Sequence, residues 1–471
     1  MPTRPDPPAA ALCPREDLEL SERLALSAAT SRGAHLATED VTDWLDERHA
    51  AGSFHARRIP LTELVERGEW RFEPGTGNLA HRSGGFFTVE GMRVAEGTGE
   101  GGPRREWEQP VISQPEVGVL GLLAKEFGGV LHFLMQAKAE PGNPRPTQLS
   151  PTVQATRSNY TRAHRGADVR LLDHFVGPGA GRVLVDVLQS EQGSWFFRKS
   201  NRNVIVETDD EVDAPEDFRW LTLGQIAELL HRDEVVNMDA RSVLSCVPHG
   251  DPTPRALLSD AALLSWFTGE RGGRAVRARR IPLSTVRGWK HGVEAIEHED
   301  GRYFRVVAVS VRAGNREVSG WTQPLIEPVG TGVAAFLLRE IDSIPHVLVH
   351  ARTEGGFLDT VELGPTVQCT PGNHAHLPLA ERPRYLEEVL TAPPSRVRYG
   401  AVHSEEGGRF LNARCRYLVI DADPRTARLD PPPGFAWATP AQLTALTRHG
   451  HYLNVEARTL LACLHAMAAR S

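Results

Sequence analysis

The strongest constraint on this chain is that it repeats itself once. PTVQ at residues 151–154 recurs at residues 365–368, a shift of 214 positions. The same shift aligns WEQPVI, which begins at Trp107, with WTQPLI, which begins at Trp321, and QSEQG with HSEEG further along. No gap is needed over this stretch. Two copies are too few for a solenoid, so the repeat predicts a duplicated globular unit.

The match extends in both directions with small changes of register. RRIPL occurs twice with a shift of 222, and NMDARSVLSC aligns with NVEARTLLAC with a shift of 217. We therefore expect a first repeat over residues 38–248 and a second over residues 260–471. The stretch between them, 249–259, is rich in turn-forming residues and is the expected linker. Residues 1–37 are expected to form a disordered leader.

The composition excludes several classes of function. The 471 residues carry 60 acidic and 53 basic side chains, a net charge of −7, which provides no basic field for nucleic acid or an anionic membrane. No apolar run approaches the roughly 20 residues needed to span a bilayer. The N-terminus lacks the order of a signal peptide, so the cytoplasm is the expected compartment. Five scattered cysteines without a CxxC pair predict neither a disulfide framework nor a structural zinc site.

Both repeats show one order of predicted elements. Strands rich in β-branched residues, bounded by turn formers, alternate with fewer helices, and each unit closes with leucines at helical spacing after a Thr cap. This pattern predicts two tandem mixed-sheet domains of the α+β class. The strands are expected at residues 86–94, 128–140, 182–189 and 195–207, and again at 303–311, 344–354, 396–403 and 409–421. The closing helices are expected at residues 222–231 and 239–246, and again at 439–448 and 455–467.

Three segments of the first repeat carry a family resemblance. They are NYTRAH at residues 159–164, QSEQGSWF at 189–196 followed by NRN at 201–203, and NMDARSVLSC at 237–246. In this order, and with their second-repeat partners, they resemble the NDP-hexose 2,3-dehydratase family over residues 44–464.

The resemblance implies an activity and a fold. Such enzymes remove the C2 hydroxyl of dTDP-4-keto-6-deoxyglucose and leave a 3,4-diketo-2,6-dideoxy sugar, for the deoxysugars of glycosylated natural products. The implied fold resembles a duplicated Nudix hydrolase domain, and the implied assembly is a homodimer. An NADPH-dependent 3-ketoreductase is expected to trap the unstable product.

The chemistry can be compared with the sequence. A ketone at C4 acidifies the C3 proton, a base removes it, and the enolate expels the C2 hydroxyl with a proton from an acid. The oxidation at C3 is internal to the sugar, so we expect no cofactor and no metal. The sequence has no GxGxxG opening a helix and no Walker-type loop. It also lacks the glutamate-rich helix with which Nudix hydrolases hold divalent metal.

The first repeat holds the preferred candidates for the site. The predicted catalytic residues are groups that can exchange protons: Tyr160, His164 and Glu191. The predicted substrate-binding residues offer cations for pyrophosphate, amide or hydroxyl groups for the sugar, and an aromatic ring for the base: Gln154, Asn159, Thr161, Arg162, Gln189, Trp195, Lys199 and Arg202. Each of these also has an ordinary structural explanation, such as a surface ion pair or a core aromatic.

The second repeat predicts a related pocket with different chemistry. Its members follow from the alignment of the repeats: Gln368, Asn373, His403, Glu405, Arg409 and Arg414. Because the two copies have diverged, we expect one active site, in the first pocket, and one relic. A swapped arrangement, in which each pocket borrows residues from the other repeat, is equally compatible with the sequence. Two other functions stay open: a Nudix-like nucleotide-sugar pyrophosphatase and a non-catalytic nucleotide-sugar-binding protein.

Overall fold

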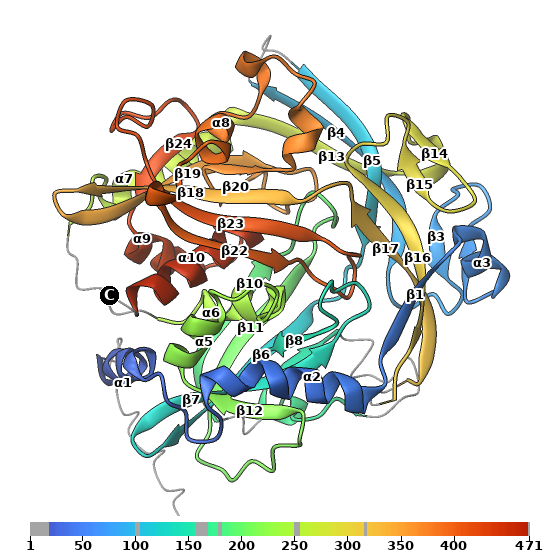
Figure 1. Ribbon diagram of the computed structural model, residues 1–471. Coiled ribbons are helices and arrows are strands. Elements are labelled where there is room, and N and C mark those ends of the chain that lie inside the picture. Colours follow the sequence, from blue (N-terminus) through green and yellow to red (C-terminus); the bar gives the residue numbers. More distant parts are fainter. Residues whose placement is uncertain are drawn as a thin grey trace, which may run out of the picture.

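Two large mixed sheets, one from each repeat, frame the molecule (Figure 1). The computed structural model describes residues 18–98, 104–156, 168–177, 181–248, 255–314 and 318–469. The first sheet has the order β10 (Arg182–Ser190), β11 (Ser200–Glu207), β6 (Gly118–Phe127), β7 (Val130–Ala139) and β12 (Phe218–Leu221), with β8 (Thr147–Ser150) on β7 and β9 (Val153–Ala155) on β6. The second has the order β22 (Val397–Ser404), β23 (Arg414–Asp421), β18 (Gly332–Ile341), β19 (Ile344–Thr353) and β20 (Val361–Gly364), with β21 (Val367–Cys369) on β18 and β24 (Phe435–Ala438) on β19.

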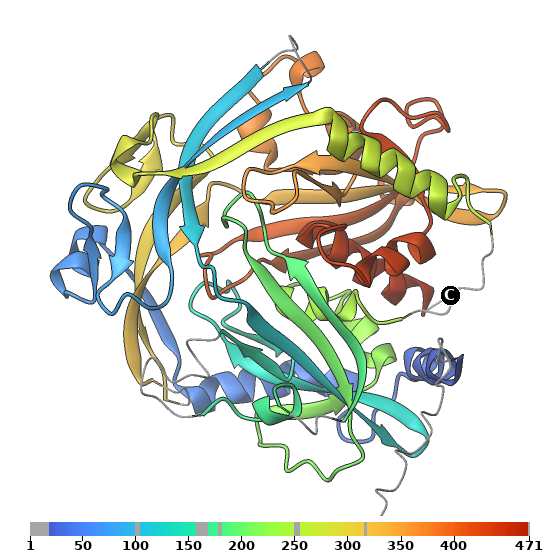
Figure 2. The same ribbon diagram turned by 180° about the vertical axis from the view of Figure 1, so that it is seen from behind.

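The two sheets share one topology. In each, the central pair is parallel, β6 with β11 and β18 with β23, and the other pairs are antiparallel. Helices occupy the space between the sheets, where α6 and α10 lie side by side (Figures 1 and 2). The α-helices are α1 (Leu18–Ala29), α2 (Val41–Gly52), α3 (Leu61–Glu66), α5 (Leu223–Leu229), α6 (Met238–Leu244), α7 (Asp260–Gly273), α8 (Leu386–Leu390), α9 (Pro440–Thr447) and α10 (Val455–Ala468). The α+β prediction is confirmed.

The repeats exchange a strand. Two smaller sheets are built around the long strands β4 (Thr88–Thr98) and β16 (Phe304–Arg312). The first RRIPL motif contributes β1 (His55–Ile59), which pairs with β16 of the second repeat, and the second contributes β13 (Arg274–Ile281), which pairs with β4 of the first. The remaining strands of these sheets are β2 (Trp70–Phe72), β3 (Leu79–His81), β5 (Arg104–Ser113), β14 (Trp289–His291), β15 (Ile296–His298) and β17 (Gly320–Pro328).

Two fully buried arginines join the repeats at the centre. The Arg241 guanidinium, on α6, donates to the carbonyl oxygen of Ser404 at 2.7 Å, and Arg458, on α10, donates to the carbonyl of Ser190. Each also donates to a carbonyl of its own repeat, Arg241 to Val236 and Arg458 to Leu453. These two arginines therefore serve the contact between the repeats.

The leader prediction is wrong for residues 18–37. Residues 18–29 form α1, whose Leu20 and Leu24 are buried in the core of the first repeat. The Ser27 hydroxyl donates to the Leu131 carbonyl at 2.6 Å and accepts from the Leu223 amide at 3.0 Å. The amphipathic spacing of leucines in α1 supplies the reason: it gives the segment an apolar face to bury.

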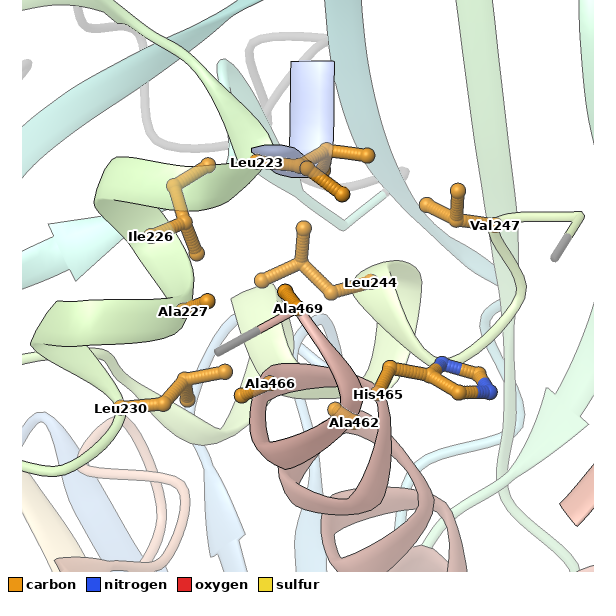
Figure 3. Close-up of a pocket in the computed structure, with 11 residues that line it drawn as sticks. Leu223, Ile226, Ala227, Leu230, Leu244, Val247, Ala462, His465, Ala466 and Ala469 are labelled. Atoms are coloured by element: carbon orange, nitrogen blue, oxygen red, sulfur yellow. The ribbon is translucent and has the colours of Figure 1, made fainter. Parts of the chain in front are cut away.

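A small apolar pocket lies where α5, α6 and α10 meet (Figure 3). Its volume is about 30 Å³, and it is lined by aliphatic side chains such as Leu223, Ile226 and Leu244, with His465 at one side. A cavity of this size holds about one water molecule. It is a packing gap between the repeats rather than a ligand site. None of the helices in the described ranges is long and apolar enough to cross a membrane.

Capping boxes begin the closing helices, as the Thr residues in the sequence predicted. Thr222 accepts from the Gln225 amide at 3.1 Å, and its counterpart Thr439 accepts from Gln442 at 3.1 Å. The Thr222 hydroxyl also donates to the carbonyl of Thr30.

Replacing either cap with alanine should destabilise the protein. For Thr439→Ala we expect a loss of about 1 kcal/mol in the free energy of unfolding, the usual effect of a lost cap. For Thr222→Ala we expect about 2 kcal/mol, because the bond to the segment after α1 is lost as well. Urea denaturation curves of both variants measure the difference. Equal losses would mean that the Thr30 contact contributes nothing.

Candidate active site

The cavity that can hold a ligand lies against the first sheet. Its volume is about 480 Å³, within the range of roughly 300–1,000 Å³ typical of small-molecule sites. The first repeat contributes most of the lining, through β2, β3, β6, β7, β9, β11 and α6. The second repeat contributes β17 and the turn between β22 and β23.

A hydrogen-bonded network positions the first acidic group. The Gln154 amide donates to Glu140 at 2.7 Å and accepts from Asn237 at 3.2 Å and from Ser150 at 2.9 Å. Glu140 accepts a further bond from Asn143 at 3.3 Å. The second repeat has the same arrangement, in which Asn454 donates to Gln368 and Gln368 to Glu354. The shared PTVQ motif therefore orients a buried carboxyl group in each repeat.

Three cations lie on the cavity wall. Lys138 donates to the Gln154 carbonyl at 2.8 Å, and Lys199 donates to the carbonyl of Glu116. Burial lowers the pKa of Lys199, and the charge of Glu191 opposes that shift. Arg409 stacks over the Phe87 ring at 4.3 Å and donates to Gln114 at 3.2 Å. Fixed cationic donors of this kind suit a pyrophosphate group.

The turn that carries Arg409 belongs to the second repeat. It docks on the first through Gly142, whose amide donates to the Gly407 carbonyl at 2.8 Å and whose carbonyl accepts from the Asn412 amide at 2.8 Å. This contact brings Glu406 and Arg409 into the first cavity. The first cavity therefore borrows residues from the second repeat, as one half of the swapped arrangement left open by the sequence requires.

Two carboxyl groups on the cavity have strongly altered acidity. Burial is the main reason that the pKa of Glu406 is raised, to about 8; Arg409 opposes the shift, and Glu191 and Glu140 add to it. The pKa of Asp239 is raised well above its usual value, mainly by burial and then by the charge of Glu406. A carboxyl group with a pKa of about 8, as for Glu406, keeps a proton near neutral pH, which suits proton transfer.

An aromatic wall faces the charged groups. It is formed by rings from the β2–β4 region and from β17 of the other repeat: Trp70, His81, Phe86, Phe87 and Trp321. The Trp70 indole donates to the Thr322 carbonyl at 2.8 Å, which fixes the ring between the two repeats. Such flat apolar faces suit a nucleobase.

Some residues predicted from sequence lie at this cavity. Gln154 and Lys199 line it. Glu191 lies behind the wall, where it accepts a bond from Asn201, a lining residue, at 2.7 Å. Burial raises the pKa of Glu191, against the effect of Arg458 and Lys199. Trp195 packs on Phe410 with ring centroids 4.6 Å apart and is not part of the lining.

Other predicted residues lie elsewhere. Gln189 is buried and donates to the Thr447 carbonyl at 2.7 Å, so it joins the repeats. Arg202 forms an ion pair with Asp186 at 2.7 Å on the outer face of β11 and donates to the Phe175 carbonyl. Neither lines the cavity. The other five predicted residues of this group lie outside the described residues: Asn159, Tyr160, Thr161, Arg162 and His164.

The residues predicted for a second pocket lie together only in part: Gln368 donates to Glu354, and burial, together with the charges of Glu354 and Glu405, raises the pKa of Glu456. Glu405 accepts from Tyr417 at 2.7 Å and from Gln192 at 3.0 Å, and His403 contacts the Tyr399 hydroxyl at 2.8 Å, all in buried surroundings. Asn373 accepts from the Tyr303 amide at 3.1 Å, and Arg414 pairs with Glu234 at the surface. The prediction that Arg409 belongs to the second pocket is wrong. Arg409 lines the first cavity, because its turn crosses to the other repeat.

Five charged residues of the cavity lining were not predicted from the sequence: Glu69, Lys138, Glu140, Asp239 and Glu406. A signal was present for two of them. Residues two apart in a strand share a face, so Lys138 and Glu140, at the end of an otherwise apolar strand, point to a polar cavity. Glu406 carried no such signal, because its repeat counterpart Gln192 is uncharged.

The described part of the chain shows no cluster of side chains that could bind a metal ion, and its cysteines are free thiols. No group of three or more His, Cys, Asp or Glu side chains there has the geometry of a metal site. Cys246, Cys369, Cys415 and Cys463 are free thiols, and burial raises the pKa of each.

Comparison with known proteins identifies the family. The family model described as NDP-hexose 2,3-dehydratase matches twice, over residues 38–247 and 260–464. A protein of Amycolatopsis orientalis named dTDP-4-dehydro-6-deoxy-alpha-D-glucopyranose 2,3-dehydratase is 65% identical over 98% of both chains. Proteins of the same name from Streptomyces violaceoruber and Saccharopolyspora spinosa are 51% and 47% identical, covering 90% and 95% of this chain and 96% of their own. The chain belongs to the NDP-hexose 2,3-dehydratase family.

Proposed function

We propose that this chain is the 2,3-dehydratase of dTDP-4-keto-6-deoxyglucose and that the 480 Å³ cavity is its active site. The observation that carries the assignment is the composition of that cavity: cations for a pyrophosphate, an aromatic wall for a base, and carboxyl groups whose pKa values burial raises. The full-length relatives named for this reaction support the substrate.

Each part of the cavity has a role in the proposed reaction. The diphosphate is held by the fixed cations Lys138, Lys199 and Arg409, and the thymine lies against Trp70 and Trp321. The sugar then lies beside the acidic lining residues Glu140, Asp239 and Glu406. A base removes the C3 proton, and the C3–C4 enolate expels the C2 hydroxyl, which leaves as water after gaining a proton. The enol formed at C3 loses its hydroxyl proton and C2 gains one, so atoms balance without an oxidant.

The predicted proton-transfer residues keep their place in this proposal. Tyr160 and His164 lie six and ten residues after Gln154, the last residue of PTVQ, and Thr156, which lies between, lines the cavity. Tyr160 and His164 are the proposed groups for removal of the C3 proton. Glu191 is proposed to act from behind the wall, through Asn201.

A trapping assay tests the function. The protein, dTDP-4-keto-6-deoxyglucose and EDTA are incubated in deuterated water with NADPH and a 3-ketoreductase. We expect a reduced product that lacks the C2 oxygen and carries deuterium at C2, seen by mass spectrometry and NMR. Unchanged substrate would contradict the proposal and favour the binding protein. Cleavage to the nucleoside monophosphate once metal is restored would favour the pyrophosphatase.

The wider setting follows from the same chemistry. The vicinal diketone product is reactive, so an NADPH-dependent 3-ketoreductase is proposed to consume it, in a cytoplasmic route to a deoxysugar of a glycosylated natural product. A homodimer and a descent of each repeat from a Nudix-like domain are proposed from the family resemblance. The repeats are proposed as residues 38–248 and 260–471, with 249–259 as the linker; residues 249–254 lie outside the described ranges. Light scattering of the purified protein tests the dimer.

A further inference from the structure

The two repeats exchange a turn as well as a strand. The turn after β22 docks on Gly142, and the matching turn after β10 docks on Gly356, whose amide donates to the Gly193 carbonyl at 2.8 Å and whose carbonyl accepts from the Arg198 amide at 2.7 Å. Each turn therefore delivers its side chains to the other repeat. The first cavity receives a glutamate, Glu406, where the equivalent turn carries Gln192.

Hydrogen bonds hold three acidic residues near the cavity, Glu69, Glu140 and Glu191, whereas within the described residues none holds the side chain of Glu406 or Asp239. Glu140 accepts bonds from Gln154 and Asn143, and Glu191 accepts from Asn201. The Glu406 carboxyl forms no hydrogen bond or ion pair with the residues that the structure describes, and its residue lines the cavity. Gly408 leaves room beside this carboxyl group, since a Cβ added there would lie 3.0 Å from Glu406 Oε1 and 3.6 Å from Glu140 Oε1.

Gln192 shows what the equivalent position does without an acid. It is buried and donates to Glu405 at 3.0 Å, so it serves as a packed hydrogen-bond donor. An amide has no proton to transfer at neutral pH. The position of Asp239 keeps an acid in the second repeat, Glu456, whose Oε2 is buried without a hydrogen-bond partner among the described residues. The exchanged turns differ instead: one adds an acid to the first cavity, and the other adds an amide to the second repeat.

Resting on the proposed function, we propose that Glu406, supplied by the second repeat, is the general acid that protonates the departing C2 hydroxyl. The Glu406 O–H bond breaks as the C2–O bond breaks, water leaves, and the enolate electrons form the C2–C3 double bond. The carboxylate that remains regains a proton from solvent or from the C3 hydroxyl as the enol becomes a ketone. The first cavity is catalytic because the second repeat completes it.

Glu406→Gln tests this role, with Glu362→Gln as the matched control. Glu362 is a fully buried glutamate outside the cavity that accepts from Ser190 at 2.6 Å, and its counterpart in the first repeat is already a glutamine, Gln148. Both variants are assayed in deuterated water for two quantities: trapped dehydration product, and deuterium incorporation at C3 of recovered substrate. Circular dichroism and thermal melting establish that each variant is folded.

We expect Glu406→Gln to lower the dehydration rate at least 100-fold, the usual range for loss of an acid or base. Deuterium exchange at C3 should continue at a rate within threefold of the wild type, because the base is intact. Glu362→Gln should keep both rates within threefold. Glu406→Asp, which retains an acid on a shorter side chain, should lose about tenfold and provides a second test if the glutamine variant does not fold.

Three results would overturn the assignment. Dehydration by folded Glu406→Gln within threefold of the wild type removes the role. Loss of C3 exchange in parallel with dehydration would make Glu406 the base instead. An equal loss in Glu362→Gln would show a general effect of removing buried acids. A wild-type protein inactive in both measurements would instead contradict the proposed function itself, and the two failures are thereby distinguished.

Discussion

Replacing Gly142 with alanine is expected to lower dehydratase activity at least 100-fold while most of the protein stays folded. A Cβ at this position would lie 1.8 Å from the Phe410 carbonyl oxygen and 2.8 Å from that of Gly407. Both are backbone atoms, so no side-chain rotation relieves the clash, and the turn that carries Glu406 and Arg409 must move. A displacement of about 1 Å at a catalytic site is enough for a loss of this size. The trapping assay measures the rate, and denaturation curves measure stability.

Gly356→Ala is the matched control for this substitution. Its added Cβ would lie 1.7 Å from the Phe196 carbonyl oxygen and 2.5 Å from that of Gly193, so the steric conflict is the same. It displaces the other turn, which carries Gln192 and Trp195 into the second repeat. We expect a similar loss of stability and an activity loss below tenfold. Equal activity losses in the two variants would contradict an active site completed by one turn alone.

Replacing Arg241 with methionine is expected to lower the free energy of unfolding by about 3–5 kcal/mol, as for a buried charged group whose partners are left behind. The carbonyl oxygens of Ser404 and Val236 lose their donor, and the pKa of Glu405, which Arg241 lowers, rises further. Arg458→Met should cost a similar amount for the same reason, through Ser190 and Leu453. Lysine at either position should restore little, because one ammonium group does not reproduce the planar fork.

An exposed arginine provides the control. Arg398 pairs with Asp421 at 2.7 Å, with 56% of its side chain exposed, and exposed pairs contribute about 0–1 kcal/mol. Arg398→Met should therefore leave the urea midpoint nearly unchanged. A loss for Arg241→Met as small as that of the control would show that the buried arginines do not hold the repeats together.

The predicted elements agree closely with the structure where local patterns decide. Strands expected at residues 128–140 and 344–354 are β7 and β19, and the closing helices begin at the predicted Thr caps. Period-two alternation and side-chain caps depend on residues a few positions apart, so they can be predicted from the sequence. The RRIPL strands β1 and β13 were not predicted. They are rich in arginine and mostly exposed, so they show no apolar alternation.

The candidate site was predictable in part. Gln154 and Lys199 were identified from motifs and line the cavity, whereas Asp239 was read only as part of a helix. Gln189 looked like a ligand-binding residue but is an internal contact with Thr447, because the sequence does not reveal which face of β10 meets the other repeat. Burial, which sets the acidity of Asp239 and Glu406, is likewise a property of the assembled fold.

The sequence by itself determined that the chain is a duplication, the order of four strands and the closing helices in each copy, and the family to which the chain belongs. Those properties reside in motifs and periodicities that neighbouring residues carry. Only the tertiary structure decided which repeat each RRIPL strand joins and which cavity receives Glu406 and Arg409. Alignment of the repeats placed Arg409 in the second pocket, since alignment assumes that equivalent residues serve their own copy. The exchange depends on close backbone approach at Gly142 and Gly356, each more than 150 residues from its partner turn, and no local pattern encodes such a pairing.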